Sequence, residues 1–563
     1  MAHPALAICT AATLLIAASL SLAAQDPALS GEREAAEAEL QGEDVLDKLR
    51  TVNARVELPP AEFAAGHVEP LEFGADRVSR TDNGFVIQLP SESPIPTPTV
   101  YDGRLYVSGG FSSEEYYCFD AQCGKLEWAV QLDDDGPSSA TPFEDSILFS
   151  CESCTLFALD AKSGAMRWSH WLGDPLLSMP AVAGREVFAV YPATPDEDLP
   201  EDAVDGNIAP SHIVAAFDAA TGKLRWRRWI DSDCMTTPVV AGDDLYLTSL
   251  TGTLYRFGRK DGAMRLAERV RATSAPVAVG ERVYLGRRAD DPGAAEVMEC
   301  ITAQDRATNA LQYAAARHAA PYLDQAVQRE AAFSQQAEEF EAPNAIGGGF
   351  GGSGGGFFSV PPDAAEGTQA DGVSDESVAP AKQTAVPADE VLEEAAPFDA
   401  LAVKQLQAAD VIGLGNVSTL QAFHGSRPLS RDGRLFSCMG DRLVCLNADS
   451  GEVLWTVPLE GDLRQAGGHL ATPPIAAGNH LLIATITGQL RLIDPSSGRT
   501  ERTWDVGSPV RFPPVVDAGR IFVGTQDGKL VCIETGDAGL TGWSMPGGDP
   551  GHNNSVTKDA NQP

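Results

Sequence analysis

The sequence predicts an all-β fold, an eight-bladed β-propeller built from four-stranded antiparallel blades. A decapeptide that combines a turn with a tryptophan recurs in eight units along the 563 residues. Asp120 and Asp160 hold the same place in two copies and stand forty residues apart, which is the length of one propeller blade. The strand and turn signals also follow the same order in each unit.

The copy FDAATGKLRW (Phe217–Trp226) indicates the end of one strand, a tight turn and the start of the next. The side chains of Asp218 and Thr221 can hydrogen-bond to backbone groups in the turn, and Gly222 can adopt the positive φ that closes it. The other copies are FDAQCGKLEW (Phe119–Trp128), LDAKSGAMRW (Leu159–Trp168), FGRKDGAMRL (Phe257–Leu266), QDRATNALQY (Gln304–Tyr313), LNADSGEVLW (Leu446–Trp455), IDPSSGRTER (from Ile493, with Trp504 two places late) and IETGDAGLTGW (Ile533–Trp543).

The remainder of each unit also favours strands. About twenty residues before most turns stands a proline followed by small or β-branched residues, and proline is tolerated at the first residue of a strand. A turn such as DAGR, an alternating strand such as DLYLT and a tight hairpin such as QDGKL come next. Each unit therefore predicts four antiparallel strands, and eight units closed into a ring leave no long exposed edge.

Two irregular spacings indicate insertions. The step from Asp160 to Asp218 includes the acidic loop Tyr191–His212. A longer interruption before blade six contains a helix-like stretch, the glycine run GGGFGGSGGGFF and an acidic Pro/Ala tract that cannot bury enough apolar surface to fold. The predicted organisation is a signal peptide at 1–24, an acidic arm at 25–82, blades one to five at 83–313, a helical then disordered insert at 314–424, blades six to eight at 425–545 and a C-terminal tail at 546–563.

The N-terminus predicts export. An apolar run ends in the small residues Ser21-Leu22-Ala23, a plausible signal-peptide cleavage site, and an uncleaved anchor is the alternative. The mature chain has no second apolar segment of the roughly 20 residues that a membrane span needs. We therefore expect a periplasmic or secreted protein. Residues 30–52 could form an amphipathic helix with Leu40, Val45, Leu46 and Leu49 on one side.

The charge of the chain excludes one class of partner. The formal net charge is −38 at pH 7, whereas nucleic-acid binding needs a basic surface. Three stretches, residues 26–72, 191–212 and 338–399, together account for −26 of this charge. The repeats themselves are therefore only mildly acidic, and no nucleic-acid partner is expected.

With turn, tryptophan and strand pattern in place, the units resemble the repeats of the pyrroloquinoline-quinone-binding-like propeller family, over roughly residues 83–313 and 425–545. The resemblance implies one of two functional groups. Quinoprotein dehydrogenases use the quinone with calcium to oxidise alcohols or sugars. Non-catalytic relatives, such as the propeller component of the outer-membrane β-barrel assembly machine, bind proteins, and the chain looks most like this exported, non-catalytic branch.

The same resemblance implies that the repeated tryptophans dock between neighbouring blades. A large ring at a fixed offset from a tight turn also suits packing of one blade on the next. We therefore predict a structural role for these tryptophans, and no role in binding a cofactor. They are Trp128, Trp168, Trp226 and Trp455.

Features of a quinoprotein active site are missing from the sequence. By resemblance such an enzyme is expected to contain a pair of adjacent cysteines and a calcium site, and the chain has no Cys-Cys pair. The acidic run Asp133–Gly136 lacks the alternating spacing of a calcium loop, and the histidines fall in no metal-ligand spacing. No catalytic, metal-binding or cofactor-binding residue is therefore assigned, and pyrroloquinoline quinone (PQQ) is implied by the family resemblance alone.

Cys151 and Cys154 form the sharpest local motif. Alignment of the repeats places them on either side of a two-residue hairpin turn, where facing Cα atoms lie about 5.5 Å apart, within disulfide range. An oxidising compartment would favour a structural disulfide. Two free thiols, or a redox or metal-binding pair, are the alternatives; a strand hairpin lacks the helix N-terminus that usually activates such thiols.

The function expected from these observations is an exported, non-enzymatic propeller that acts as a scaffold for protein–protein interactions in the cell envelope. Two alternatives remain open. One is a diverged PQQ-dependent oxidoreductase, and the other is a propeller that binds a small molecule or polysaccharide in its central channel.

Overall fold

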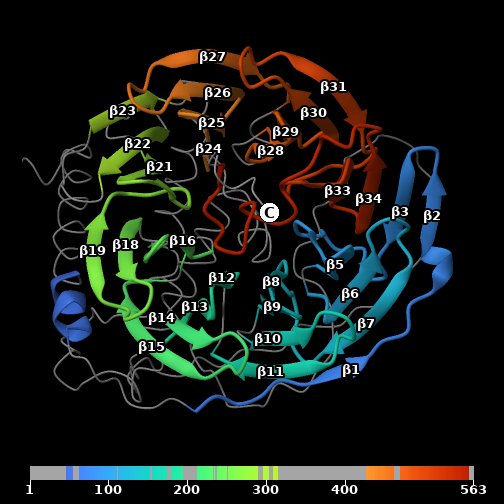
Figure 1. The fold of residues 1–563 in the computed structure, drawn as a ribbon, viewed down its shortest axis with the longest axis horizontal. Coiled ribbons are helices and arrows are strands. Elements are labelled where there is room, and N and C mark those ends of the chain that lie inside the picture. The colour runs from blue at the N-terminus through green and yellow to red at the C-terminus, as the bar shows by residue number, and fades with distance from the viewer. Residues whose placement is uncertain are drawn as a thin grey trace, which may run out of the picture.

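Eight β-sheets surround a central axis in the computed structural model (Figure 1). Each sheet has four antiparallel strands, arranged side by side in order from the axis to the outside. Three sheets carry one additional strand. This confirms the predicted eight-bladed β-propeller. The structure describes residues 46–54, 62–110, 112–152, 155–173, 179–193, 212–232, 234, 237–249, 252–288, 296–302, 309–314, 427–461 and 470–556.

Several predicted segments lie outside these residues. They are the signal peptide (1–24), most of the acidic loop (194–211) and the insert from residue 315 onward. Their expected structures stay predictions.

The first four blades follow one another along the chain, each starting with its innermost strand. Blade 1 contains β4 (Thr99–Tyr101), β5 (Arg104–Ser108), β6 (Glu115–Asp120) and β7 (Leu126–Leu132); blade 2 contains β8 (Thr141–Phe143), β9 (Ser146–Ser150), β10 (Thr155–Asp160) and β11 (Met166–Trp171); blade 3 contains β12 (Ala181–Ala183), β13 (Glu186–Pro192), β14 (His212–Asp218) and β15 (Leu224–Ile230); blade 4 contains β16 (Val239–Ala241), β17 (Asp244–Thr248), β18 (Thr253–Gly258) and β19 (Met264–Arg269).

The last four blades keep this order, except that an N-terminal strand completes the eighth. Blade 5 contains β20 (Val277–Val279), β21 (Arg282–Arg288), β22 (Glu296–Thr302) and β23 (Asn309–Ala314); blade 6 contains β24 (Leu429–Arg431), β25 (Arg434–Met439), β26 (Arg442–Asn447) and β27 (Val453–Pro458); blade 7 contains β28 (Ile475–Ala477), β29 (His480–Ala484), β30 (Gln489–Ile493) and β31 (Thr500–Asp505); blade 8 contains β32 (Val515–Asp517), β33 (Arg520–Gly524), β34 (Lys529–Glu534) and β3 (Gly84–Gln88).

The turn of the decapeptide forms as its sequence indicates. In blade 3, Oδ1 of Asp218 accepts hydrogen bonds from the backbone N–H groups of Ala220 at 3.2 Å and Thr221 at 3.1 Å. The N–H of Gly222 donates to the carbonyl of Asp218 at 2.8 Å, and Gly222 has a φ of 70°. One carboxylate therefore satisfies the turn that connects the third and fourth strands.

Strand β3 closes the ring by joining the two ends of the chain. It pairs with β34, so that Gly84 faces Ile533 and Gln88 faces Lys529. The range 83–313, expected to hold blades one to five, therefore also contains the fourth strand of blade 8. β2 (Val78–Thr81) pairs outside β3 and follows the short 3₁₀ helix η1 (Ala75–Arg77), while β1 (Val68–Pro70) pairs outside β7.

The described residues of the N-terminal arm run along the outside of the ring (Figure 1). We call residues 46–54 and 62–81 the outer strap. Residues 46–53 are helical, and the side chains of Leu46 and Leu49 are fully buried in the core that blades 3 and 4 share. Towards the C-terminus the strap then reaches blade 2 through Ala64, blade 1 through β1 and blade 8 through β2.

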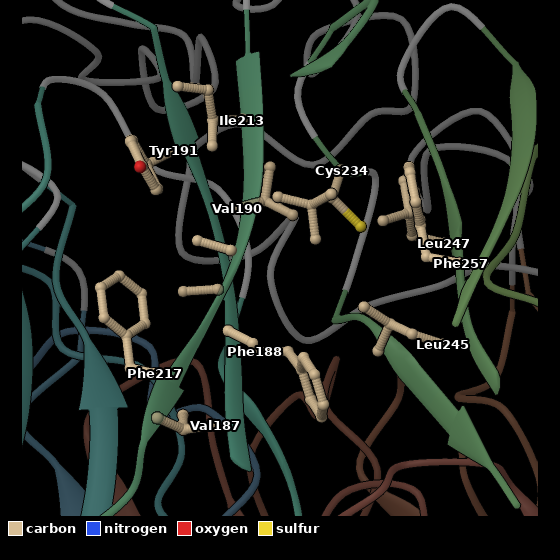
Figure 2. Packing of buried hydrophobic residues seen from close by; sticks show 14 of the residues in the cluster. Val187, Phe188, Val190, Tyr191, Ile213, Phe217, Cys234, Leu245, Leu247 and Phe257 are labelled. Atoms are coloured by element: carbon tan, nitrogen blue, oxygen red, sulfur yellow. The ribbon is translucent and has the colours of Figure 1, made fainter. Parts of the chain in front are cut away.

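The hydrophobic core lies largely between neighbouring blades. In Figure 2, Phe188 of β13, Leu245 of β17 and Phe257 of β18 belong to one buried cluster that spans blades 3 and 4. Phe63 of the outer strap contacts this cluster from outside, with its ring centroid 5.7 Å from that of Phe217. Since the apolar surface of each blade is covered by the next blade, no blade has a complete core of its own.

Candidate functional site

The four predicted tryptophans each reach from the outer strand of one blade to the turn of the next blade. The indole Nε1–H of Trp168, in blade 2, donates to the carbonyl of Ala219 in blade 3 at 3.0 Å. The acceptor is in each case the residue directly after the position of the turn aspartate. The other three bonds run from Trp128 to Ala161 (3.1 Å), from Trp226 to Arg259 (2.9 Å) and from Trp455 to Pro495 (3.1 Å).

A turn glycine lies directly against each of these indole rings. A Cβ atom added to Gly222 would lie 2.8 Å from Cδ2 of Trp168, closer than real Cβ contacts allow. The corresponding nearest distances to the ring are 2.8 Å for Gly164 on Trp128, 2.6 Å for Gly262 on Trp226 and 2.7 Å for Gly498 on Trp455. Glycine is therefore required at this position for two reasons: the backbone has a positive φ, and there is no space for a side chain.

Four blades have a residue other than tryptophan at this position, which is Leu266 in blade 4 and Tyr313 in blade 5. In blade 7 it is Arg502 that faces Leu492, and its guanidinium donates to the carbonyl of Thr535 in blade 8 at 2.9 Å. Trp504 lies two pairs further along the strand, and the guanidinium of Arg502 lies 4.6 Å from the centroid of its ring. In blade 8 the position belongs to Phe85 of β3, because the fourth strand comes from the N-terminus.

The C-terminal segment occupies the axis of the ring (Figure 1). We call residues 541–556 the axial segment, which includes Trp543 and the first part of the predicted tail. Its backbone and side chains form hydrogen bonds with all eight blades. The bonds are Val100 N–H to Ser544 O (2.7 Å), Thr141 Oγ1 with His552 Nε2 (3.1 Å), Val182 N–H to Pro550 O (2.7 Å), Val240 N–H to Gly551 O (2.8 Å), Ala278 N–H to Asn553 Oδ1 (2.8 Å), Ser430 N–H to Asn554 O (3.1 Å), Gly478 N–H to Thr541 O (2.8 Å) and Val516 N–H to Trp543 O (2.7 Å).

These bonds have a common physical reason. The innermost strand of a blade has one edge without a neighbouring strand of its own sheet, and a buried N–H without an acceptor is costly. In blade 2 the corresponding residue is Pro142, which has no N–H, and there the side chain of Thr141 makes the contact with His552 instead. The axial segment thus supplies acceptors where the closed ring leaves donors facing the axis.

Two titratable side chains are buried at the axis: Arg427 of the ring and His552 of the axial segment itself. Burial lowers the pKa of Arg427 to about 10, while Asp549 acts in the opposite direction. The guanidinium of Arg427 donates to the carbonyl of His552. Burial also lowers the pKa of His552, whose Nδ1 lies 2.6 Å from the carbonyl oxygen of Pro546. Both groups hold the axial segment in place through hydrogen bonds to backbone carbonyls.

The cavity that lies beside the axial segment does not fit a quinone cofactor. This cavity, lined by Thr97, Arg427, Trp543 and Asn554 among others, has a volume of about 20 Å³, which is room for one water molecule. Binding sites for small molecules typically enclose hundreds of Å³. PQQ is a tricyclic tricarboxylate and is therefore far too large for this cavity.

Cys151 is described, whereas Cys154 lies outside the described residues, so the disulfide between them stays a prediction. The side chain of Cys151 is fully buried. Burial, followed by the carboxylates of Asp134 and Asp135, raises the pKa of this thiol well above its usual value. This environment disfavours the thiolate that a redox or metal-binding role needs.

One carboxylate of the acidic run Asp133–Gly136 accepts a hydrogen bond from the backbone of blade 2. Asp134 is buried, and its Oδ2 accepts a hydrogen bond from the backbone N–H of Thr155 at 3.0 Å. Within the described part of the chain, no three His, Cys, Asp or Glu side chains are grouped closely enough to hold a metal ion. In the same part of the chain, no helix has the length and apolar character to span a membrane.

A ring of eight four-stranded blades, joined by tryptophan contacts to the next turn, defines a PQQ-like propeller. The chain belongs to the PQQ-like repeat family described as outer membrane protein assembly factor BamB. The sequence model of this family matches residues 113–208, 210–334, 403–501 and 442–558, which together cover about two-thirds of the chain.

Individual relatives are distant. Outer membrane protein assembly factor BamB of Shewanella oneidensis is 29% identical over 123 residues, 21% of this chain and 29% of that protein. The serine/threonine-protein kinase AfsK of Streptomyces griseus is 27% identical over 174 residues, 29% of this chain and 20% of that protein. The chain therefore spans less than a third of either relative. The crystal structure of BamB from Moraxella catarrhalis matches 84% of this chain and 97% of its own, with 14% identity and a TM-score of 0.34.

Proposed function

We propose that this protein is an exported, non-catalytic propeller that binds proteins of the cell envelope as a scaffold. The observation that carries the proposal is the occupied axis. Because residues 541–556 hydrogen-bond to all eight blades, the centre of the ring is built from the chain itself, and the surfaces left for recognition are the outer faces of the blades. Broad outer surfaces suit protein partners better than small molecules.

Family membership supports the same function. The family is described as an outer membrane protein assembly factor, and so is the relative from Shewanella oneidensis. The predicted signal peptide at residues 1–24 would deliver the chain to the periplasm or the exterior, where such partners occur. The net charge of −38 argues against nucleic acids as partners in this role.

Affinity purification from the producing cell tests the scaffold function. The full-length protein, tagged at its C-terminus, is cross-linked in intact cells and recovered from the solubilised envelope. We expect a reproducible set of envelope proteins, enriched over an unrelated exported propeller carrying the same tag. Recovery of the same proteins with both baits would contradict the proposal.

Native mass spectrometry with PQQ and Ca²⁺ tests the enzymatic alternative. Because the cavity beside the axial segment has room for only a water molecule, we expect the full-length protein to retain no quinone. One quinone retained per chain, together with dye reduction on addition of an alcohol or sugar, would overturn the non-catalytic assignment.

A further inference from the structure

The residue left unpaired by a β-bulge in the fourth strand differs in character between blades. In six blades the pairing of the third and fourth strands contains a β-bulge directly before the residue at the tryptophan position. The residue left unpaired by this bulge lies at the outer corner of the blade. These bulge residues are Glu127, Arg167, Arg225, Arg265, Leu454 and Glu501 in blades 1, 2, 3, 4, 6 and 7.

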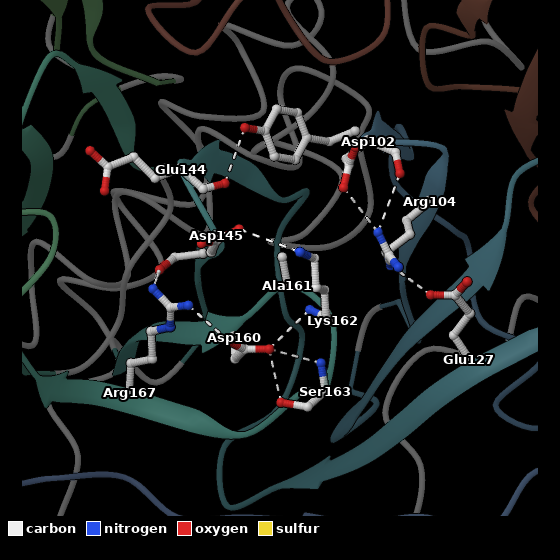
Figure 3. Close-up of polar contacts among 12 residues, drawn as sticks. Asp102, Arg104, Glu127, Glu144, Asp145, Asp160, Ala161, Lys162, Ser163 and Arg167 are labelled. Carbon is white, nitrogen blue, oxygen red and sulfur yellow. Dashed lines mark hydrogen bonds and ion pairs between the residues drawn. The ribbon is translucent and has the colours of Figure 1, made fainter.

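In five of the six blades the bulge residue is charged and contacts the first residue of the second strand. Figure 3 shows two of these corners, in blades 1 and 2. Arg104 contacts Glu127 at 2.6 Å, and Ser146 accepts a hydrogen bond from Arg167 at 2.8 Å. The other three contacts join Glu186 to Arg225 (3.2 Å), Asp244 to Arg265, and His480 to Glu501 (3.0 Å).

Blade 6 lacks this polar corner. Its bulge residue is Leu454, and the preceding residue is Val453; each side chain is 41% exposed. Arg434 stands at the start of the second strand, where blade 1 has Arg104, and its Nη1 donates to the carbonyl of Pro495 at 2.9 Å. Compared with blade 1, blade 6 thus keeps an arginine at the start of the second strand and has the exposed Leu454 in place of the carboxylate of Glu127.

Within the part of the chain that the structure describes, the edge of the same blade has no neighbouring strand. β27, with the sequence VLWTVP, contains no charged residue and is the outermost strand of its sheet among the described residues. The edges of β7 and β3 are covered by strands of the outer strap, and the edges of β11 and β15 receive backbone or side-chain hydrogen bonds from Ala64 and Asn53. An apolar strand edge without charges favours pairing with another strand.

We propose that β27 and the corner formed by Val453, Leu454 and Arg434 dock an extended segment of a partner protein. The segment adds to β27 as a strand, places an apolar side chain on Leu454 and brings a carboxylate to Arg434. Charge complementarity sets this chemistry, because the acid that pairs with Arg104 in blade 1 has no counterpart on β27. The outer strap shows the mode of binding, since an extended segment already pairs with the matching edge of blade 1. The inference rests on the proposed scaffold function and names its binding edge.

Fluorescence anisotropy with a synthetic peptide tests the edge directly. The probe has about eight residues, which is within the usual length of a strand, and it alternates threonine and valine with one aspartate. A second peptide carries lysine in place of the aspartate, and a third has alternate backbone nitrogens methylated to block strand addition. The full-length protein is compared with Leu454→Gln, Arg434→Gln and Met166→Gln. Met166 is a matched control because it is 40% exposed at the place in blade 2 that Val453 has in blade 6.

We expect the wild-type protein to bind the acidic peptide and Leu454→Gln to weaken binding about tenfold, equal to about 1.4 kcal/mol. Arg434→Gln should weaken the acidic peptide and leave the lysine peptide unaffected, whereas Met166→Gln should bind as the wild type does. Failure of the wild type to bind, equal binding by all four proteins, or equal binding of the methylated peptide would overturn the proposal.

Two further outcomes identify other occupants and also overturn the partner assignment. A dimer in sedimentation velocity that Leu454→Gln dissociates would assign the edge to a second copy of the chain. A gain in peptide affinity on deleting residues 25–45 would assign it to the acidic arm. If Leu454→Gln no longer binds the peptide but still recovers an unchanged set of envelope proteins, the edge assignment fails and the scaffold function stands. If the wild-type protein recovers no envelope proteins in the affinity purification, the scaffold function itself fails.

Discussion

Trp168 and Gly222 show how two residues join one blade to the next. The indole donates a hydrogen bond to the turn that contains the glycine, and its ring fills the space that a side chain at residue 222 would occupy. The bond also gives the buried indole N–H an acceptor, which a core of apolar side chains could not offer. Repetition of this contact explains why the decapeptide recurs: its two ends serve two different interfaces of the blade.

Replacing Gly222 with alanine should therefore cost more than backbone strain alone. We expect Gly222→Ala to lower the free energy of unfolding by about 2–4 kcal/mol, from the left-handed φ and from overlap with Trp168. Gly184→Ala is the control in the same blade, because Gly184 has a φ of 60° with no atom near its Cβ position. It should cost about 1 kcal/mol. Urea unfolding followed by tryptophan fluorescence measures both, and equal losses would show that the indole contact contributes nothing.

At the scale of the element, strand edges explain where the two ends of the chain lie. The inner strands direct N–H groups to the axis, where the axial segment accepts them. On the outside, the outer strap pairs with edges that would otherwise attract other chains. The side chain of Asn53 does this without being in a strand: its amide donates to the carbonyl of Trp229 at 2.9 Å and accepts from the N–H of Trp229 at 2.8 Å.

Asn53→Ala removes both of these bonds and leaves a buried N–H and C=O on β15 without partners. We expect a loss of about 1–3 kcal/mol in the free energy of unfolding and faster amide hydrogen exchange at Trp229. Thr51→Ala, on the same helix, is the control because its hydroxyl donates to the carbonyl of Asp47 in an exposed position. Unchanged exchange at Trp229 in Asn53→Ala would contradict this role of the strap.

At the scale of the whole molecule, the ring is closed by the two ends of the chain working together. β3 from the N-terminus completes blade 8, and the axial segment from the C-terminus contacts every blade. Both contacts join residues that are far apart in the chain. Forming them closes long loops of chain, which has an entropic cost.

Deleting residues 541–563 should consequently destabilise the whole ring and not one blade alone. We expect the midpoint of thermal unfolding to fall by several degrees, since about eight hydrogen bonds of about 1 kcal/mol each are lost. A chain shortened by residues 557–563 alone is the control, because these residues lie beyond the axial segment. Calorimetry distinguishes the outcomes: a midpoint equal to that of the control would show that the axial segment adds no stability to the ring.

The sequence by itself determined the repeat, and with it the number of blades, the four strands in each and the turn built on Asp218 and Gly222. These features depend on residues close together in the chain, so a period of forty residues and a turn motif are enough to reveal them. A helix was predicted over residues 30–52 for the same reason; residues 46–53 are helical, and the part before residue 46 lies outside the described residues.

Only the tertiary structure decided which blade each end of the chain completes, and what lies at the axis. Nothing local in residues 84–88 indicates pairing with β34, and nothing in residues 541–556 indicates contact with eight blades, because those partners are hundreds of residues away in the chain. The substitution of Leu454 for a charged bulge residue became interpretable only once the strand register aligned it with Glu127 and Arg167. Short-range patterns are recorded in the order of the residues, whereas edges, corners and the axis exist only after the ring has closed.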